Sequence, residues 1–292
     1  MIRTVNVTNY RGETLAIELA NPYSSGFAVT KITGLGPNKA TINTVDIATS
    51  DGSVFNSARV DPRNIVMTIM FAGNDIEELR RKSYRYFPLK KQLSLEFITD
   101  KRSATITGYV ESNEPDIFSK TENTQISIVC PYPYFRSTVA NVNRVSFFGE
   151  EPLFEFPFEN EGEDPVIEMG EILQVTEGNV EYLGDADVGA VFTIHATGYA
   201  KNIRIDNIDT RESMTIKVEL EKGDDLIITT VTGKKSIKRL RSGVSTNFLN
   251  LLDRDSDWFV LSKGGNAFAY QAEEGLNNLQ FEVSFDVLYE GV

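Results

Sequence analysis

Several residue types that active sites commonly use are nearly absent from this chain of 292 residues. The sequence has one cysteine, Cys130, and one histidine, His195. A single cysteine excludes an intramolecular disulfide framework, and one residue of each type excludes the usual Cys/His zinc sites. A serine or cysteine nucleophile would have to use His195, which lies in a strand-like segment, and a structural role is the better prediction there.

Long hydrophobic runs are also missing. The longest nearly apolar run, residues 65–72, is interrupted by Thr68, whereas a membrane-spanning helix needs about 20 apolar residues. After Arg3 the first residues alternate between apolar and polar side chains, which does not match a secretory signal. We therefore expect no transmembrane helix and synthesis in a cytoplasm.

Basic residues are scarce in the second half of the chain. Residues 1–140 hold 16 basic and 14 acidic side chains, whereas residues 141–292 hold 13 and 28. Residues 150–187 include 13 acidic side chains and no lysine or arginine. Such an acidic half disfavours sequence-specific binding of nucleic acid. The break predicts three segments: a domain over 1–138, a linker over 139–150 and a second domain over 151–292.

The first half has the pattern of a β-rich domain with one helix. Asn74 with Glu77 predicts the N-terminal cap of a helix over 75–87, which Pro88 ends. Its predicted packing face is formed by Ile76, Leu79, Ser83 and Tyr86. Alternating or continuous runs of apolar residues predict strands at 4–7, 14–19, 41–47, 62–71, 93–97, 104–110 and 125–130. We expect a β-sandwich or barrel-like domain.

The second half predicts short strands and no helix. Strand-like runs lie at 191–196, 203–208, 214–220, 225–231, 258–261, 267–271 and 279–289. Turn signals separate them, at Gly223-Asp224, Thr232-Gly233 and Gly264-Gly265-Asn266. This spacing indicates an antiparallel sandwich of galectin or jelly-roll type. The predicted fold class is mainly β (α+β).

The partial motifs in the chain do not complete a reactive or metal-binding site. The segment 233–236 resembles the end of a phosphate-binding loop but lacks its first glycine and its Ser or Thr. Asp253, Asp255 and Asp257 have the spacing of the first calcium ligands, but Trp258 stands where the loop needs glycine. We predict no catalytic residues, no cofactor and no metal site. A glycosidase remains a third hypothesis, because the acidic residues are abundant.

Aromatic residues offer two candidate contact sites. Tyr132, Tyr134 and Phe135 lie among prolines, and they either line a sugar or partner site or pack as a rigid connection where a strand ends. Trp258 is a candidate sugar or partner contact, although the apolar residues after it favour a place in the core.

Six blocks of the sequence resemble siphophage distal tail proteins, the family that forms the hub at the tip of a long phage tail. They are IEELRRKSYRYFPLK at 76–90, LSLEF at 93–97, TGYVESNEPDIFSKTENTQISIVCPYPYF at 107–135, NIRIDNIDT at 202–210, GDDLIITTVTGKKSI at 223–237 and DSDWFVLSKGGNAFAY at 255–270. The blocks follow the family order at similar spacing over nearly the whole chain.

The resemblance implies a structural protein of the virion, located at the tail tip and made in the bacterial host cytoplasm. Its N-terminal domain would form a homo-hexameric ring that continues the tail tube, with DNA passing through only in transit. Its C-terminal domain would be a peripheral galectin-like or carbohydrate-module-like sandwich. The implied partners are the tail tube protein, the tape measure protein, the tail-associated lysin or fibre and receptor-binding proteins.

The basic face of the predicted helix is the candidate ring contact. It carries Arg80, Arg81, Lys82 and Arg85, whereas the second domain is acidic. A solvated helix face is the alternative for these residues. For the whole chain, the alternative function is a carbohydrate-binding module for bacterial cell-wall polysaccharide, with Trp258 as a stacking residue.

Overall fold

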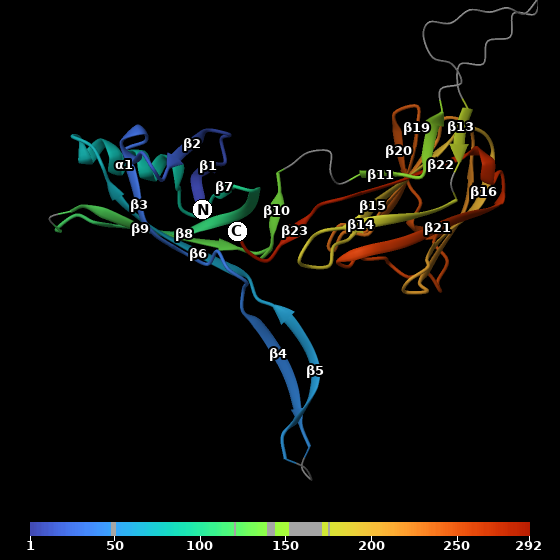
Figure 1. The fold of residues 1–292 in the computed structure, drawn as a ribbon, viewed down its shortest axis with the longest axis horizontal. Helices are drawn as coiled ribbons and strands as arrows, with labels where there is room; N and C mark the ends of the chain where they lie inside the picture. Colours follow the sequence, from blue (N-terminus) through green and yellow to red (C-terminus); the bar gives the residue numbers. More distant parts are fainter. Residues whose placement is uncertain (48–50, 120, 139–143, 152–170, 175) are drawn as a thin grey trace, which may run out of the picture. The chain divides into compact units, whose positions relative to one another are not determined.

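The computed structural model describes residues 1–47, 51–119, 121–138, 144–151, 171–174 and 176–292 (Figure 1). The chain divides into two compact units. Unit 1 comprises Met1–Ala140 and Leu288–Val292, and unit 2 comprises Asn141–Val287. Most of the acidic stretch at 150–187 lies outside the described residues. Antiparallel strands dominate both units, which confirms the mainly β fold class.

Unit 1 is built on one large antiparallel sheet with the order β2-β1-β7-β8-β9-β6-β3. Two short strands, β10 and β23, extend it beside β8. The strands are β1 (Ile2–Thr8), β2 (Thr14–Glu18), β3 (Phe27–Thr33), β6 (Arg63–Phe71), β7 (Gln92–Thr99), β8 (Ser103–Asp116), β9 (Asn123–Cys130), β10 (Phe135–Ser137) and β23 (Leu288–Tyr289).

The core of unit 1 follows from alternation along these strands. In β7, for example, Leu93, Leu95 and Phe97 are buried while Ser94 and Glu96 between them are not, because successive side chains of a strand point to opposite faces. The buried residues of β1, β6, β8 and β9 belong to the same apolar cluster. The strands predicted in this half are confirmed, and β3 is an additional one.

The helix α1 (Ile76–Tyr86) packs on this core through the predicted face, with Ser83 fully buried. Its cap differs from the prediction: the N-cap is Asp75, whose Oδ1 accepts from the backbone N–H of Glu78 at 2.9 Å. Asn74 lies one residue too early to reach the first turn. Within the part of the chain that is described, no helix is long and apolar enough to cross a membrane.

A long hairpin joins β3 to β6. Its strands, β4 (Ala40–Asp46) and β5 (Ser53–Val60), pair only with each other among the described strands. Figure 1 shows them running side by side with no other strand along either edge. The sequence predicted β4 but not β5, because polar Asn56, Ser57 and Arg59 break up the apolar residues of this strand.

The last residues of the chain return to unit 1. Strand β23 pairs with β10, with Tyr289 opposite Phe135, and Leu288 is buried. The Val292 N–H donates to the carbonyl oxygen of Leu35 at 3.0 Å. The charge pattern predicts one second domain over the whole of 151–292, because a strand of two residues carries no pattern of its own.

Unit 2 contains two larger antiparallel sheets, with the orders β11-β22-β15-β18-β19-β20 and β14-β21-β16-β17, and a separate β12-β13 pair. The strands of the first sheet are β11 (Arg144–Ser146), β15 (Ala190–Ala196), β18 (Asp225–Thr229), β19 (Ser236–Arg241), β20 (Val244–Asn247) and β22 (Leu279–Phe285). The others are β14 (Glu177–Tyr182), β16 (Ala200–Asn207), β17 (Ser213–Leu220), β21 (Gly264–Glu274), β12 (Phe148–Glu151) and β13 (Glu171–Gln174).

Aromatic side chains join the two larger sheets of unit 2 face to face. The Phe192 ring of β15 lies 5.3 Å from the Phe268 ring of β21, measured between centroids. The Tyr270 ring of β21 stacks at 5.1 Å on Phe281 of β22. Two sheets that share one core in this way form a sandwich, as the sequence predicted.

Three predictions for the second half differ from the structure. Residues 258–261 form no strand, although Leu261 makes one isolated bridge to Val188. Phe259 and Leu261 are buried in the core from an irregular segment. The predicted turn at 264–266 lies at the start of β21. The predicted linker over 139–150 contains β11 and most of β12, and its residues 139–143 lie outside the described residues.

Candidate interaction surfaces

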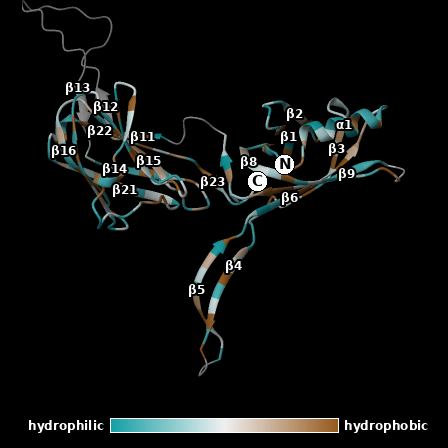
Figure 2. Ribbon diagram, turned by 180° about the vertical axis from the view of Figure 1, so that it is seen from behind, coloured by the Kyte–Doolittle hydropathy of each residue, from teal (hydrophilic) through white to brown (hydrophobic). Residues whose placement is uncertain are grey.

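The hairpin β4–β5 presents an apolar face to solvent. The cross-strand register places Ala40 opposite Val60, Ile42 opposite Ala58 and Phe55 opposite Thr44 on one side. Ile42 and Phe55 are each 63% exposed. Figure 2 shows hydrophobic segments among hydrophilic ones along both strands. Large exposed apolar side chains that share one face of a strand pair are typical of an interaction surface.

The opposite face of the hairpin is polar near its base. Thr41 pairs with Arg59, and Asn43 pairs with Ser57, whose hydroxyl accepts from the Asn43 amide at 3.0 Å. The hairpin is therefore amphipathic near its base.

A buried arginine fixes the base of the hairpin. Arg63, the first residue of β6, is 1% exposed. Its guanidinium donates to four backbone carbonyl oxygens at 2.6–2.7 Å, those of Gly34, Gly36, Pro133 and Glu290. Because these hydrogen bonds involve a charged donor, each is stronger than a neutral one.

The Arg63 guanidinium also lies over the Phe135 ring, 4.7 Å from its centroid. Burial lowers the pKa of Arg63, although arginine stays protonated at any physiological pH. The four carbonyl oxygens and the Phe135 ring face stabilise the positive charge of Arg63, as a carboxylate would in an ion pair. One side chain thus joins the segment before β4, the start of β10 and the returning C-terminal residues.

Asp61 holds the other side of the hairpin base. Its two carboxylate oxygens accept from the Thr41 hydroxyl at 2.7 and 2.9 Å. Its backbone N–H donates to the backbone carbonyl oxygen of Lys39 at 3.1 Å. We call the group formed by Arg63, Asp61 and their partners the hairpin root. It sets the direction in which the hairpin starts.

The four basic residues predicted as a ring contact lie on α1 and are all engaged within unit 1. Arg80 lies 3.7 Å from Glu122, Arg81 2.5 Å from Glu77 and Arg85 2.6 Å from Glu13. Lys82 donates to the carbonyl oxygen of Ser25 at 2.8 Å and lies over the Phe27 ring. Arg81 and Arg85 stay mostly exposed, at 75% and 60% of the side chain, and line a shallow depression of about 410 Å³.

The Glu13–Arg85 pair shifts the acidity of its carboxylate. Hydrogen bonding to Arg85, then to Asn9, holds the pKa of Glu13 at about 2, below its ordinary value of 4.5. The pair connects α1 to the segment just before β2.

Trp258 in unit 2 is half-buried, so it is not one of the core residues. The neighbouring Phe259 and Leu261 are fully buried instead. The Lys235 ammonium lies 5.2 Å from the centroid of the Trp258 ring. A cation in that position contacts one face of the indole ring.

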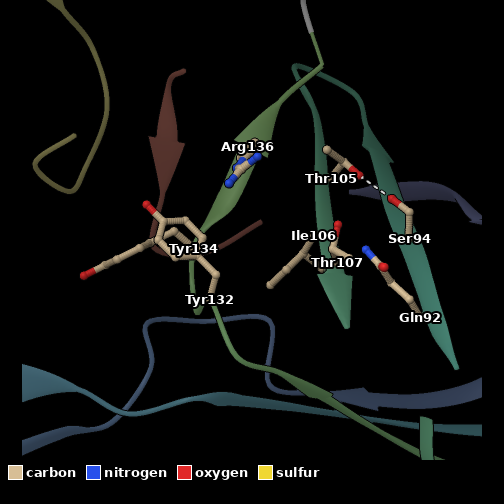
Figure 3. Close-up of a pocket in the computed structure, with 8 residues that line it drawn as sticks. All are labelled: Gln92, Ser94, Thr105, Ile106, Thr107, Tyr132, Tyr134 and Arg136. Atoms are coloured by element: carbon tan, nitrogen blue, oxygen red, sulfur yellow. Dashed lines mark hydrogen bonds between the residues drawn. The ribbon is translucent and has the colours of Figure 1, made fainter. Parts of the chain in front are cut away.

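The tyrosines singled out in the sequence line a cavity of about 290 Å³ in unit 1 (Figure 3). We call it the tyrosine pocket. Its lining residues are Gln92, Ser94, Thr105, Ile106, Thr107, Tyr132, Tyr134 and Arg136. Phe135, which directly follows Tyr134, is fully buried in the core. The aromatic segment thus both packs a strand end and lines a surface site.

The remaining candidates are engaged in local interactions. His195 Nδ1 lies 2.6 Å from Asp225 Oδ1 on the neighbouring strand. Asp253 pairs with Lys217 at 2.7 Å. Among the described residues, no group of three or more His, Cys, Asp or Glu side chains is arranged to hold a metal ion.

The sequence of unit 2 matches a known family. Residues 183–287 match the model for the siphovirus-type tail component, C-terminal domain, named for the Dit protein of phage SPP1. This part of the chain is therefore similar to a tail component, and the resemblance to siphophage distal tail proteins is confirmed. No curated protein matches the chain.

Solved structures share the fold over the full length. The structure of the SPP1 Dit (gp 19.1) protein, described as a paradigm of the hub adsorption apparatus in phages that infect Gram-positive bacteria, has a TM-score of 0.66 and 13% identity. The match covers 97% of this chain and 98% of that one. A chain of the phage P2 baseplate in its activated, calcium-bound conformation has a TM-score of 0.50 and 13% identity, with full coverage of both chains.

Sequence reasoning found some of these surfaces and missed others. It singled out the tyrosines and the basic face of α1. It missed the polar wall of the tyrosine pocket, since Gln92 and Thr107 come from different strands and carry no local motif. It also missed the hairpin root, although a lone arginine at the start of an apolar strand, as at Arg63, is a usable signal.

Proposed function

We propose that this protein is a structural hub of a phage tail tip, in which copies of unit 1 assemble into a hexameric ring that continues the tail tube. The match of residues 183–287 to a tail-component domain and the Dit-like fold support the assignment. In this role the chain has no catalytic activity. Unit 2 would sit at the periphery and anchor host-recognition components.

The observation that carries the ring proposal is the exposed apolar face of the β4–β5 hairpin. A monomer gains nothing from holding Ile42 and Phe55 in water. Because each is 63% exposed, burying the rest of its surface would release roughly 1–2 kcal/mol. A repeated head-to-tail contact buries such a face on every copy at once and closes when the rotation is right. The hairpin root presents the face in the same direction in each copy.

The basic face of α1 is the second proposed contact. Arg81 and Arg85 have partners but stay exposed, so an acidic surface of a neighbouring copy can add to their ion pairs. Such surface attraction is screened within about 10 Å at 0.1 M salt. Charge reversal at both positions (R81E with R85E) is expected to weaken assembly more at low salt than at high salt.

The ring is tested by the mass of the assembly in solution. Native mass spectrometry and light scattering of the full chain, at rising concentration, are expected to show a hexamer. The double variant I42D with F55D should remain monomeric. N43D with S57D makes the same charge change on the polar face and should assemble like the wild type.

Two results would overturn the ring proposal. One is a wild-type protein that stays monomeric even with tail tube protein present. The other is an apolar-face variant that assembles as well as its polar-face control. Equal melting temperatures of the two variants would show that any difference comes from assembly and not from folding.

A further inference from the structure

We propose that the tyrosine pocket of unit 1 binds a saccharide, taking one uncharged pyranose unit. This site is separate from the hub role, and its ligand contacts would come from both walls of the pocket. One wall is aromatic and the other carries hydroxyl and amide groups (Figure 3). That combination is what a sugar requires, because a pyranose has an apolar face of C–H groups and a rim of hydroxyls.

The aromatic wall is held in place before any ligand arrives. Pro131 and Pro133 flank Tyr132 and fix two backbone φ angles. The rings of Tyr132 and Tyr134 meet edge to face, 5.5 Å apart, and the Arg136 guanidinium lies 5.3 Å from the Tyr132 centroid. Tyr132 is nevertheless 40% exposed. A ring that is both ordered and accessible costs little entropy on binding.

The polar wall comes from the outer face of two paired strands. Thr107 lies opposite Ser94 in the register of β7 and β8. The hydroxyls of Ser94 and Thr105 share a hydrogen bond of 2.9 Å. Gln92 and Thr107 are exposed at the same wall. Hydroxyl and amide groups both donate and accept hydrogen bonds, so they can pair with a sugar hydroxyl whether it acts as donor or as acceptor.

Charge and size narrow the ligand class further. Among the lining residues that the structure describes, Arg136 is the only charged one and none is acidic, which argues against a cationic ligand. The pocket volume of about 290 Å³ lies just below the roughly 300–1,000 Å³ of small-molecule sites. It holds roughly ten waters at about 30 Å³ each, which suits one sugar ring and not a nucleotide.

Saturation-transfer NMR on the full chain tests the proposal. The probes are glucose, galactose, rhamnose and N-acetylglucosamine, each at millimolar concentration. At least one is expected to receive saturation, with a Kd of roughly 1 mM. Loss of one aromatic contact should weaken binding about tenfold in Tyr132→Ala, and Gln92→Ala should weaken it as well.

The matched control is Tyr23→Ala, which removes an exposed tyrosine of unit 1 outside the pocket. It should bind like the wild type, and so should Trp258→Ala in unit 2. The proposal is overturned if no probe is saturated, if Tyr132→Ala and Gln92→Ala bind like the wild type, or if only Trp258→Ala loses binding. The mass of the assembly reports on the ring independently, so either proposal can fail alone.

Discussion

The Arg63 guanidinium donates a hydrogen bond of 2.7 Å to the backbone carbonyl oxygen of Glu290, across 227 residues of sequence. The two residues bracket all of unit 2, so this contact closes unit 1 after the chain has left it and come back. The same guanidinium holds Gly34 and Gly36 before the hairpin. Arg63 therefore links the completion of the sheet to the placement of the hairpin.

Replacing Arg63 with methionine is expected to destabilise unit 1 by roughly 3 kcal/mol, because buried carbonyl oxygens then lose a charged donor. Chemical denaturation followed by circular dichroism measures the loss. Arg59→Met serves as the control, since Arg59 is 77% exposed and should change stability by less than about 0.5 kcal/mol. Equal stabilities of the two variants would contradict this account of Arg63.

Removal of residues 288–292 is expected to weaken unit 1 and leave unit 2 unchanged. The deletion removes β23, the buried Leu288 side chain and the carbonyl that Arg63 contacts. Hydrogen exchange should therefore accelerate in β8 and β10 but not in β15. Glu290→Ala keeps the backbone carbonyl and is the matched control, with wild-type exchange expected.

The Glu13–Arg85 pair predicts a dependence of stability on pH. Because the pKa of Glu13 is about 2 in the folded chain and 4.5 ordinarily, its ionised form stabilises unit 1 above pH 4.5. That contribution falls as the pH drops from 4.5 to about 2. NMR titration should show the Glu13 pKa rising toward 4.5 in Arg85→Gln, whereas Arg81→Gln should leave it low.

Cys130 is expected to resist thiol reagents in the folded protein. It is fully buried in β9, and burial raises the pKa of its thiol to about 11, so little reactive thiolate forms. Labelling by a disulfide reagent at pH 8 should proceed only as unit 1 opens. It should accelerate in Arg63→Met and stay slow in Arg59→Met. Rapid labelling of the native wild type would contradict the buried position.

The sequence predicted what depends on local pattern. Alternation in segments such as 93–97 predicted strands, because half-buried strands repeat every two residues. The helix was placed correctly, but its cap was assigned to Asn74 instead of Asp75, since both are good capping residues and adjacent. The segment 258–261 was misread as a strand, because a run of large apolar residues also suits an irregular core segment.

What the sequence could not predict depends on contacts between distant segments. The amphipathic hairpin arises from the register of β4 against β5, with a bulge after Asn43, and no single strand shows it. The tyrosine pocket needs Gln92 to face Tyr132, which come from separate strands of the sheet. The return of β23 rests on two residues, too few for any periodic signal.

The late return of β23 also orders events during synthesis. The ribosome makes residues 288–292 only after it has made all of unit 2. At roughly 5–20 residues per second, unit 2 takes about 7–30 seconds to translate. During that interval Arg63 has been made but the Glu290 carbonyl oxygen to which it donates has not. Unit 2 can therefore finish folding before unit 1, although most of unit 1 is synthesised first.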